Sequence, residues 1–358
     1  MSVTMWFESY WPGLKSEVGG KAASLGEMTG VGLPVPPGYA VTTAGYRAAH
    51  DAADLDATLA RLLHGLDTSD TAQVSTVCAE IRDVIRTMPL PAHVEERIRL
   101  DYEQLCRKCE VDSLPVAVRS SATSEDSPDA SFAGEHDTYL WIRGDDAVVD
   151  AVRRCWASLF TDRATCYRAE MGYEHRSVDM AVVIQKMVRP IAAGVAFTLN
   201  PANGDRSQVA IDAAWGFGEG VVSGEVTPDN FLIDKVLLEV TKRDISNKAH
   251  EYRLTDHDSV EKATIDDDRA EKPCMTDVQL KAVASLAKTA ERHYGCPQDI
   301  EWAVDADLPE GENIILLQAR PETVWSKKPR ESVTGGAAKD PMASIVSTLM
   351  NPLYTKKQ

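Results

Sequence analysis

The feature of this sequence that most constrains its fold is a change of texture near Asp179. Segments with helical periodicity predominate before this residue, whereas short runs of apolar and β-branched residues, separated by glycine and proline, follow it. No strand–helix–strand unit repeats along the chain. This order of elements predicts an α+β fold with two lobes.

The predicted elements fall into a helical half and a strand-rich half. In the first half the sequence predicts strands over 39–42, 115–121 and 138–142, and helices over 20–29, most of 53–109, 147–160 and 162–171. In the second half it predicts a charged hairpin region, one long helix over 277–294, and strands over 180–188, 194–199, 208–213, 231–234, 299–304 and 314–318.

The charge balance bears on the class of partner. The chain has 358 residues, enough for two or three domains, and carries a net charge of -17. Nucleic acid or an anionic membrane as the main partner would require a broad positive surface, which this charge disfavours. A nucleotide remains compatible, because local lysines, arginines and backbone N–H groups set the field around its phosphates.

The cysteines and the N-terminal segment bear on the compartment. Cys106 and Cys109 form a lone CxxC without a second pair or a histidine at zinc spacing, so ordinary reduced thiols are expected. The N-terminus has no basic segment followed by an apolar one, and no apolar run approaches the length of a membrane span. These features predict a cytoplasmic protein.

Two segments have the composition of phosphate-binding loops. Gly19 and Gly20 precede a helix, where backbone N–H groups and the helix dipole favour an anion, and Lys21 would lie in the first turn. A strand then leads through Arg119 into a loop over 120–134 that is rich in hydroxyl groups. The alternatives are a plain helix start for the first segment and an ordinary serine-rich turn for the second. A lone histidine in a polar loop, such as His136 that follows this segment, is more often solvated than catalytic.

Two further segments carry weaker signals. The strand that contains Gln185 ends in a polar–lysine–methionine step that fits an adenine edge, although most such strands are simply core. Four glycines between Gly216 and Gly224 indicate a close backbone approach or a mobile loop. Their spacing is not that of a dinucleotide-binding fingerprint.

The last two predicted strands carry the richest chemistry. If they pair antiparallel, Glu301, Gln318 and Arg320 can point to one face of the sheet. A carboxylate and an amide oxygen suit Mg²⁺, which takes its other ligands from water and phosphate. Arg320 could then neutralise the charge that builds up on a phosphoryl group during transfer.

Taken in order, these segments resemble the nucleotide-binding region of the phosphoenolpyruvate synthase and pyruvate phosphate dikinase family. The resemblance covers roughly residues 10–325 and rests on GGKAASLGEM, PVPPGYAVT, AVRSSATSEDSPDASFAG, FTLNP, WGFGEGVVSG, DIEWA and QARPET. It implies a two-lobed ATP-grasp fold that clamps ATP and Mg²⁺. On this basis we expect an N-terminal lobe over 1–180, a C-terminal lobe over 181–325, and a linker or partner-docking tail over 326–358, with a frayed tail as the alternative.

The resemblance also implies roles for particular residues. Glu301 and Gln318 would hold Mg²⁺, and the catalytic residues would be Lys21, Arg119 and Arg320. The full set that it implies for binding ATP is Lys21, Arg119, Gly134, Thr138, Gln185, Glu301, Gln318 and Arg320.

In that family the grasp domain phosphorylates a histidine on a separate swivelling domain, and ATP is converted to AMP and phosphate. The histidine lies in a Thr-Ser-His-Ala-Ala type of segment, and none of the 8 histidines here has such a setting. The resemblance therefore implies a partner subunit that carries the swivelling domain and the acceptor site.

The identity of the acceptor is left open by the sequence. A free-standing chain of this size resembles the ATP-binding subunits of aryl phosphate synthases, which predicts a phenolic acceptor such as phenol or cresol. One alternative is the nucleotide-binding part of a phosphoenolpyruvate synthase or a rifampicin phosphotransferase, split or truncated. Another is a module that senses ATP without catalysis, against which the presence of every expected ligand type argues.

Overall fold

The computed structural model describes residues 2–123, 126–127, 130–131, 138–172, 178–255 and 259–325. The chain divides into two compact units, Met1–Glu322 and Thr323–Gln358, and every helix and strand described below belongs to the first. The fold is α+β, as predicted. Within the described ranges, no helix has both the length and the apolar character needed to cross a membrane.

The first sheet has five strands in the order β1-β2-β7-β3-β6. Its strands are β1 (Thr4–Trp6), β2 (Gly38–Val41), β3 (Val116–Ala122), β6 (Thr138–Ile142) and β7 (Met180–Lys186), and all pairings are antiparallel. β7 lies between β2 and β3, and its residues from Met180 to Gln185 are buried. A run of apolar residues without alternation is typical of such a central strand.

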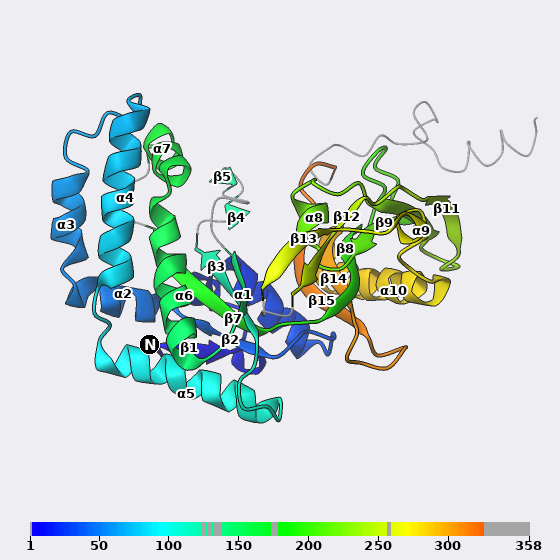
Figure 1. Ribbon diagram of the computed structural model, residues 1–358, viewed down its shortest axis with the longest axis horizontal. Coiled ribbons are helices and arrows are strands. Elements are labelled where there is room, and N and C mark those ends of the chain that lie inside the picture. The colour runs from blue at the N-terminus through cyan, green and yellow to red at the C-terminus, as the bar shows by residue number, and fades with distance from the viewer. Residues whose placement is uncertain are drawn as a thin grey trace, which may run out of the picture. The chain divides into compact units, whose positions relative to one another are not determined.

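One face of this sheet is covered by a layer of helices (Figure 1). Val116, Val118, Val182 and Ile184 point into this layer and form a single core with it. The helices of the layer are α2 (Thr43–Ala52), α3 (Leu55–Leu62), α4 (Thr71–Thr87), α5 (Ala92–Lys108), α6 (Asp145–Ala157) and α7 (Asp162–Glu170), with the 3-10 turn η2 (Ser158–Phe160).

The opposite face of the first sheet packs on α1 (Lys15–Gly30), which follows the 3-10 turn η1 (Phe7–Ser9). The helix is interrupted at Gly19, where φ is 74° and ψ is 173°, so its regular part begins at Gly20. Val18, Ala22 and Leu25 are buried against Val183 of β7. The predicted helix over 20–29 therefore corresponds to the regular part of α1.

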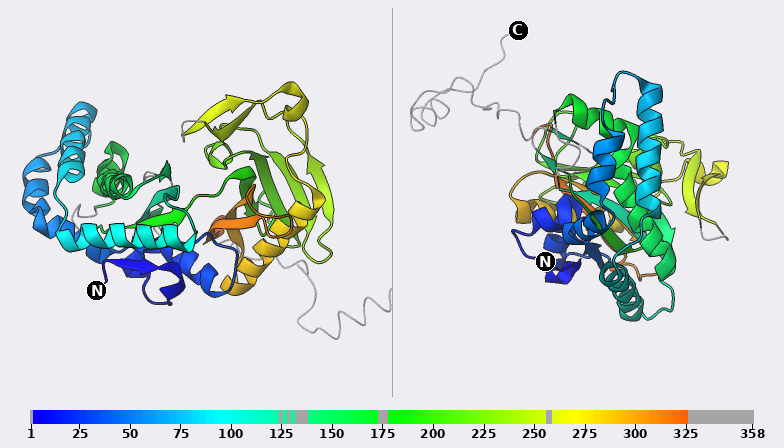
Figure 2. Two further views of the ribbon diagram at one scale, coloured as in Figure 1. Left: turned by 60° about the horizontal axis from the view of Figure 1, so that its bottom comes forward. Right: turned by 90° about the vertical axis from the view of Figure 1, so that its left-hand side faces the viewer.

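The second sheet has six strands in the order β11-β10-β9-β8-β14-β15, again all antiparallel. Helix α10 (Asp277–Tyr294) packs on one face, as Figure 2 shows from a second direction. The strands are β8 (Pro190–Phe197), β9 (Gln208–Trp215), β10 (Asp229–Asp234), β11 (Val240–Asp244), β14 (Gln298–Asp305) and β15 (Ile314–Pro321).

Smaller elements complete the fold. β12 (His250–Leu254) and β13 (Val260–Thr264) form a separate hairpin, which corresponds to the predicted charged hairpin region. The other small elements are the helices α8 (Glu219–Val222) and α9 (Asp267–Ala270) and the short strands β4 (Asp126–Ser127) and β5 (Ala130–Ser131).

A fully buried ion pair fixes the loop that precedes β12. Lys248 Nζ lies 2.5 Å from Asp229 Oδ1 at the start of β10, and both side chains are 0% exposed. The two oxygens of Asp229 also accept backbone N–H groups from Ser246 and Cys274. These contacts satisfy charges that would otherwise be costly to bury.

The structure agrees with the predicted strand and helix content and differs at several boundaries. The predicted bounds of β6 and α10 are confirmed, whereas β1 and α2 were missed. β7 pairs with β2 and β3 of the first sheet, and residues 187–189 connect it to β8 of the second sheet. Both sheets also lie within one compact unit, so the division into lobes at 180/181 remains a proposal.

Candidate functional site

The candidate site is built on the last two strands, β14 and β15. Their antiparallel register places Glu301 opposite Gln318, and Asp299 opposite Arg320. Residues that face each other across strands, and residues two apart along a strand, lie on the same face of a sheet. The four polar side chains therefore share one face, as the sequence predicted for three of them.

Arg119 of β3 reaches this face from the first sheet. Its Nη2 atom donates to Gln318 Oε1 at 2.9 Å and lies 3.2 Å from Glu301 Oε2. Its Nη1 atom donates to the backbone oxygen of Leu317 at 3.4 Å. The side chain of Arg119 is 16% exposed and that of Glu301 is 25% exposed, so water screens this ion pair less than a surface pair.

Arg320 is held by Asp299, a residue that the sequence patterns did not single out. Arg320 Nε and Nη2 lie 2.8 Å and 2.7 Å from the same oxygen of Asp299. Burial raises the pKa of the Asp299 carboxyl, and the neighbouring Arg320 offsets part of that increase. The signal was present in the sequence, because Asp299 precedes Glu301 by two residues in a strand and so faces the same way.

Lys21 lies in α1, next to β3. Its Nζ atom donates to the backbone oxygen of Ser120 at 3.1 Å, so Lys21 contacts the residue that follows Arg119. The neighbouring N–H of Ala22 donates to Ser121 Oγ at 3.2 Å. This helix start is therefore tied to β3 by a serine.

Gly19 has a structural reason of its own to be glycine. A Cβ atom at this position would lie 2.0 Å from the backbone oxygen of Ser121, and the φ angle of +74° is strained for other residues. Gly19 thus allows α1 to approach β3 closely, and this approach positions Lys21.

The remaining predicted residues lie in different surroundings. Thr138 begins β6 opposite Arg119, and it is exposed. Gln185 is 2% exposed, and its Nε2 atom donates to the backbone oxygen of Pro36 at 3.3 Å. The structure therefore does not bring the Gln185 amide into the polar cluster. Gly134 and His136 lie outside the described residues.

The oxygens of Glu301 and Gln318 fit a divalent cation. Both lie within 3.2 Å of one guanidinium nitrogen, so they converge on a point that already holds positive charge. No group of three or more histidine, cysteine, aspartate or glutamate side chains with metal-binding geometry occurs among the described residues. An ion held here would complete its shell with water and phosphate oxygens, as Mg²⁺ commonly does.

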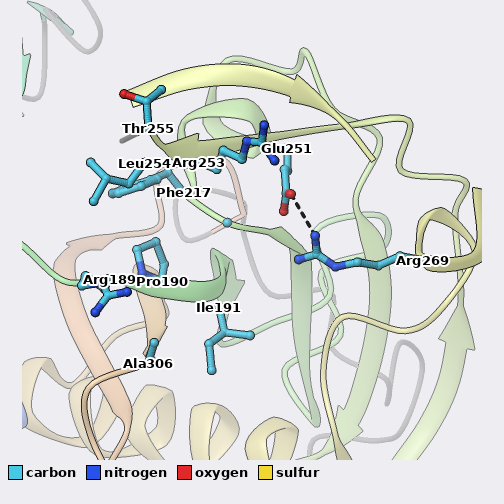
Figure 3. A pocket seen from close by; sticks show the side chains of 11 residues that line it. Arg189, Pro190, Ile191, Phe217, Glu251, Arg253, Leu254, Thr255, Arg269 and Ala306 are labelled. Atoms are coloured by element: carbon cyan, nitrogen blue, oxygen red, sulfur yellow. Dashed lines mark hydrogen bonds and ion pairs between the residues drawn. The ribbon is translucent and has the colours of Figure 1, made fainter. Parts of the chain in front are cut away.

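A separate pocket of about 490 Å³ lies beside β8 and β12 (Figure 3). Figure 3 shows Arg189, Pro190 and Ile191 on one side of it, and Arg269 paired with Glu251 at 2.8 Å on another. It shares no residue with the predicted nucleotide-binding set. The polar cluster, and not this pocket, is therefore the candidate site.

The polar cluster brings together four of the residues singled out from the sequence, and comparison with known proteins shows the family to which the chain belongs. Residues 15–340 match the family of pyruvate phosphate dikinase AMP/ATP-binding domains. The chain belongs to this family. The resemblance stated from the motifs is thereby confirmed.

Named relatives of this AMP/ATP-binding domain are phosphoenolpyruvate synthases. The chain is 43% identical over 331 residues to the probable phosphoenolpyruvate synthase of Staphylothermus marinus, covering 86% of this chain and 40% of that protein. It is 42% identical over 313 residues to the probable enzyme of Methanocaldococcus jannaschii, covering 87% of this chain and 26% of that protein.

A third relative is the phosphoenolpyruvate synthase of Aeropyrum pernix, with 38% identity over 356 residues, 92% of this chain and 43% of that protein. The chain therefore spans less than half the length of each of these three relatives. The relatives contain further regions beyond the AMP/ATP-binding domain.

Proposed function

We propose that this chain is the ATP-binding module of a phosphotransferase of the phosphoenolpyruvate synthase type. The observation that supports this most directly is the cluster of Arg119, Glu301, Gln318 and Arg320 in a domain of the AMP/ATP-binding family. Glu301, Gln318 and Arg320 on one face of the second sheet, with Arg119 reaching them from the first, are suited to a metal-bound triphosphate.

Each residue of the cluster has a distinct part in this proposal. Glu301 and Gln318 hold Mg²⁺, which when bound neutralises phosphate charge as it develops. Arg320, oriented by Asp299, presents its guanidinium to the phosphoryl group that is transferred. Lys21 and Arg119 bind the other phosphate oxygens, and Gly134, Thr138 and Gln185 complete the expected nucleotide site.

The two sheets, with this cluster between them, support an ATP-grasp arrangement in which the nucleotide binds between the lobes. The acceptor in the first step would be a histidine on a swivelling domain outside this chain, with conversion of ATP to AMP and phosphate. The relatives support the existence of further regions, because they are more than twice as long as the part that this chain matches.

The final acceptor that we favour is that of a phosphoenolpyruvate synthase. The relatives described above are all named as such, whereas nothing in their names refers to a phenolic acceptor. The aryl phosphate synthase interpretation, with phenol or cresol as the acceptor, thus has less support than the alternative that the sequence left open.

The test is to measure nucleotide binding and then phosphoryl transfer. Calorimetry with the full chain should detect binding of Mg·ATP that is lost in EDTA. Co-purified partner proteins should acquire phosphohistidine from ATP labelled at the β position, with release of AMP and phosphate. A chain that binds Mg·ATP and yields no AMP with its partner is a sensing module, and a chain that binds no nucleotide refutes the proposal.

The acceptor is tested in the reconstituted system. Continued release of AMP, beyond one equivalent per phosphorylated histidine, should depend on pyruvate and not on phenol or cresol. Dependence on the phenolic compounds alone would restore the aryl phosphate interpretation.

A further inference from the structure

Arg119 makes its side-chain contacts across a large distance in sequence. Its partner Glu301 is 182 residues away and its partner Gln318 is 199 residues away, and both belong to the second sheet. Arg119 itself extends from β3, a central strand of the first sheet. The guanidinium therefore lies where β3 of the first sheet meets the polar face of β14 and β15.

A single nitrogen of Arg119 contacts both of the oxygens that suit a divalent cation. Nη2 is 2.9 Å from Gln318 Oε1 and 3.2 Å from Glu301 Oε2. An ion such as Mg²⁺ needs its oxygen ligands at about 2.0–2.1 Å. The ion and the guanidinium nitrogen would then compete for the same two oxygens, and their positive charges would repel strongly at such short range.

We propose that Arg119 is a built-in counter-cation that holds the metal ligands in the nucleotide-free protein and is exchanged for the divalent ion. This inference rests on the proposed function and concerns how that site is controlled. Arg119 and the ion exclude each other at Glu301 and Gln318, so the ion binds only as Arg119 leaves.

The exchange explains how ion and nucleotide bind together. When the ion enters alone, Arg119 loses its partly buried ion pair with Glu301 and receives only water as a replacement partner. When the ion enters with a nucleotide, the phosphate oxygens replace Glu301 as the anionic partner of Arg119. The ion therefore binds weakly to the empty site and tightly with the nucleotide, and the coupling is reciprocal.

The test is to measure Mn²⁺ binding to the full chain without nucleotide, by electron paramagnetic resonance of the free ion. Mn²⁺ has the same preference as Mg²⁺ for carboxylate and carbonyl oxygens. In Arg119→Met the competing charge is removed while most of the aliphatic stem is kept. We expect its Mn²⁺ affinity to exceed that of the wild type by about tenfold or more, given the short separation of the charges.

Two further variants serve as controls for folding and for the loss of an arginine elsewhere. Arg119→Lys keeps a positive charge for folding, but its shorter side chain has a single donor nitrogen in place of Nη1 and Nη2. Its hold on the two oxygens should be weaker, so an intermediate gain in Mn²⁺ affinity is expected. Arg243→Ala removes an arginine of β11 that pairs with Asp277 at 2.7 Å, and it should leave Mn²⁺ affinity unchanged. Unchanged or weaker Mn²⁺ binding in both Arg119 variants would overturn the exchange.

The same titrations separate this inference from the proposed function. If the wild type binds no Mn²⁺ even with ATP, the metal–nucleotide site itself is refuted. If the wild type binds Mn²⁺ with ATP but the Arg119 variants show no gain without it, only the exchange is refuted. A gain in metal affinity together with a loss of ATP affinity in Arg119→Met supports both.

Discussion

Two arginines at the candidate site are held by two carboxylates of a single strand. Asp299 contacts Arg320 within the second sheet, whereas Glu301 contacts Arg119 of the first sheet. Arg320 is 50% exposed and its partner Asp299 is 11% exposed. The half-exposed guanidinium can thus reach a ligand while a buried carboxylate limits its orientation.

Arg320→Ala should lower phosphoryl transfer by about 10²–10³-fold, as is typical when one preorganised group that stabilises developing charge is removed. The measurement is the rate of AMP formation in the presence of the partner, with Arg243→Ala as the control for loss of a surface arginine. Circular dichroism should show an unchanged fold. Near-normal turnover would remove Arg320 from the catalytic set.

Asp212 of β9 gives a prediction about pH. Asp212 pairs with Val195 of β8, which in turn pairs with Glu301 of β14. Asp212 Oδ1 accepts a hydrogen bond from Asn230 Nδ2 at 2.7 Å. Burial raises the pKa of the Asp212 carboxyl, and the Asn230 hydrogen bond offsets only part of this. The folded state therefore binds the proton more tightly than the unfolded state. The free energy of unfolding falls as pH rises from the ordinary pKa of aspartate through the higher pKa of folded Asp212.

Asp212→Asn should raise the free energy of unfolding at neutral pH, because the variant removes a charge that is costly to bury and can keep the hydrogen bond. The gain should vanish below the ordinary pKa of aspartate, about 3.9, where both states are protonated. Urea unfolding at several pH values checks this. Asp277→Asn should have the opposite sign, since Arg243 lowers the pKa of Asp277.

At the scale of elements, helix α1 is the piece that joins the two sheets. It packs on β3 and β7 of the first sheet, and Ser24 Oγ donates to the backbone oxygen of Ala319 in β15 at 2.6 Å. The helix is interrupted at Gly19, and beside this break Ser121 Oγ donates to the backbone oxygen of Val18 at 2.8 Å. This bond holds the start of α1 against β3. Displacement of α1 would therefore affect the fold and the position of Lys21 together.

Gly19→Ala should destabilise the protein by about 1–3 kcal/mol from backbone strain, with a further cost from the clash with Ser121. It should also weaken ATP binding, because Lys21 is two residues away. Gly30→Ala is the matched control, since a Cβ at that position meets no atom within 4 Å. Thermal unfolding of both variants measures the loss of stability, and calorimetry measures the loss of ATP affinity. Equal stability of the two variants would contradict the role of the break.

The buried pair of Lys248 and Asp229 anchors the loop between β11 and β12. Lys248→Met should cost about 3–5 kcal/mol, because Asp229 would keep a buried charge without its partner. Lys242→Met removes a surface ion pair with Asp244 and should cost less than about 1 kcal/mol. Urea unfolding of the two variants gives the comparison, and a similar cost for both would contradict the anchoring role of the pair.

At the scale of the whole molecule, the two sheets share one hydrophobic core. The buried cluster that includes Val18 and Leu25 of α1 extends from Val183 in the first sheet to Ile300 and Leu316 in the second. A core that continues across both sheets makes it costly to unfold one of them alone. The compact unit Met1–Glu322 should therefore unfold as one body.

We expect a single thermal transition that Mg·ATP moves upward. At a free ligand concentration 100 times the dissociation constant, the stabilisation is about 2.7 kcal/mol. Scanning calorimetry with and without Mg·ATP measures it, and Glu301→Gln should lose most of the effect. Two separate transitions, only one of which responds to the ligand, would show that the sheets unfold independently.

The sequence by itself determined most of the local elements, although not β1 and α2, and it determined the family. The long helix α10 shows why: Thr276 and Gln279 form a capping box at its start, and Gly295 adopts the left-handed conformation at its end. Such signals lie within a few residues of each other, so the chain encodes them without reference to the rest of the fold. The sequence predicted the two strands β14 and β15, and it predicted a shared face for Glu301, Gln318 and Arg320 on the condition that they pair antiparallel, as they do.

Only the tertiary structure decided which side chains meet. That Arg119 contacts Glu301 and Gln318 depends on how the two sheets are arranged. That Gln185 faces Pro36 depends on packing between residues 149 positions apart at the first sheet. The break at Gly19 likewise follows from its contact with Ser121, about 100 residues away. Local sequence patterns fix which groups are present, whereas the packing of distant strands fixes the distances between them.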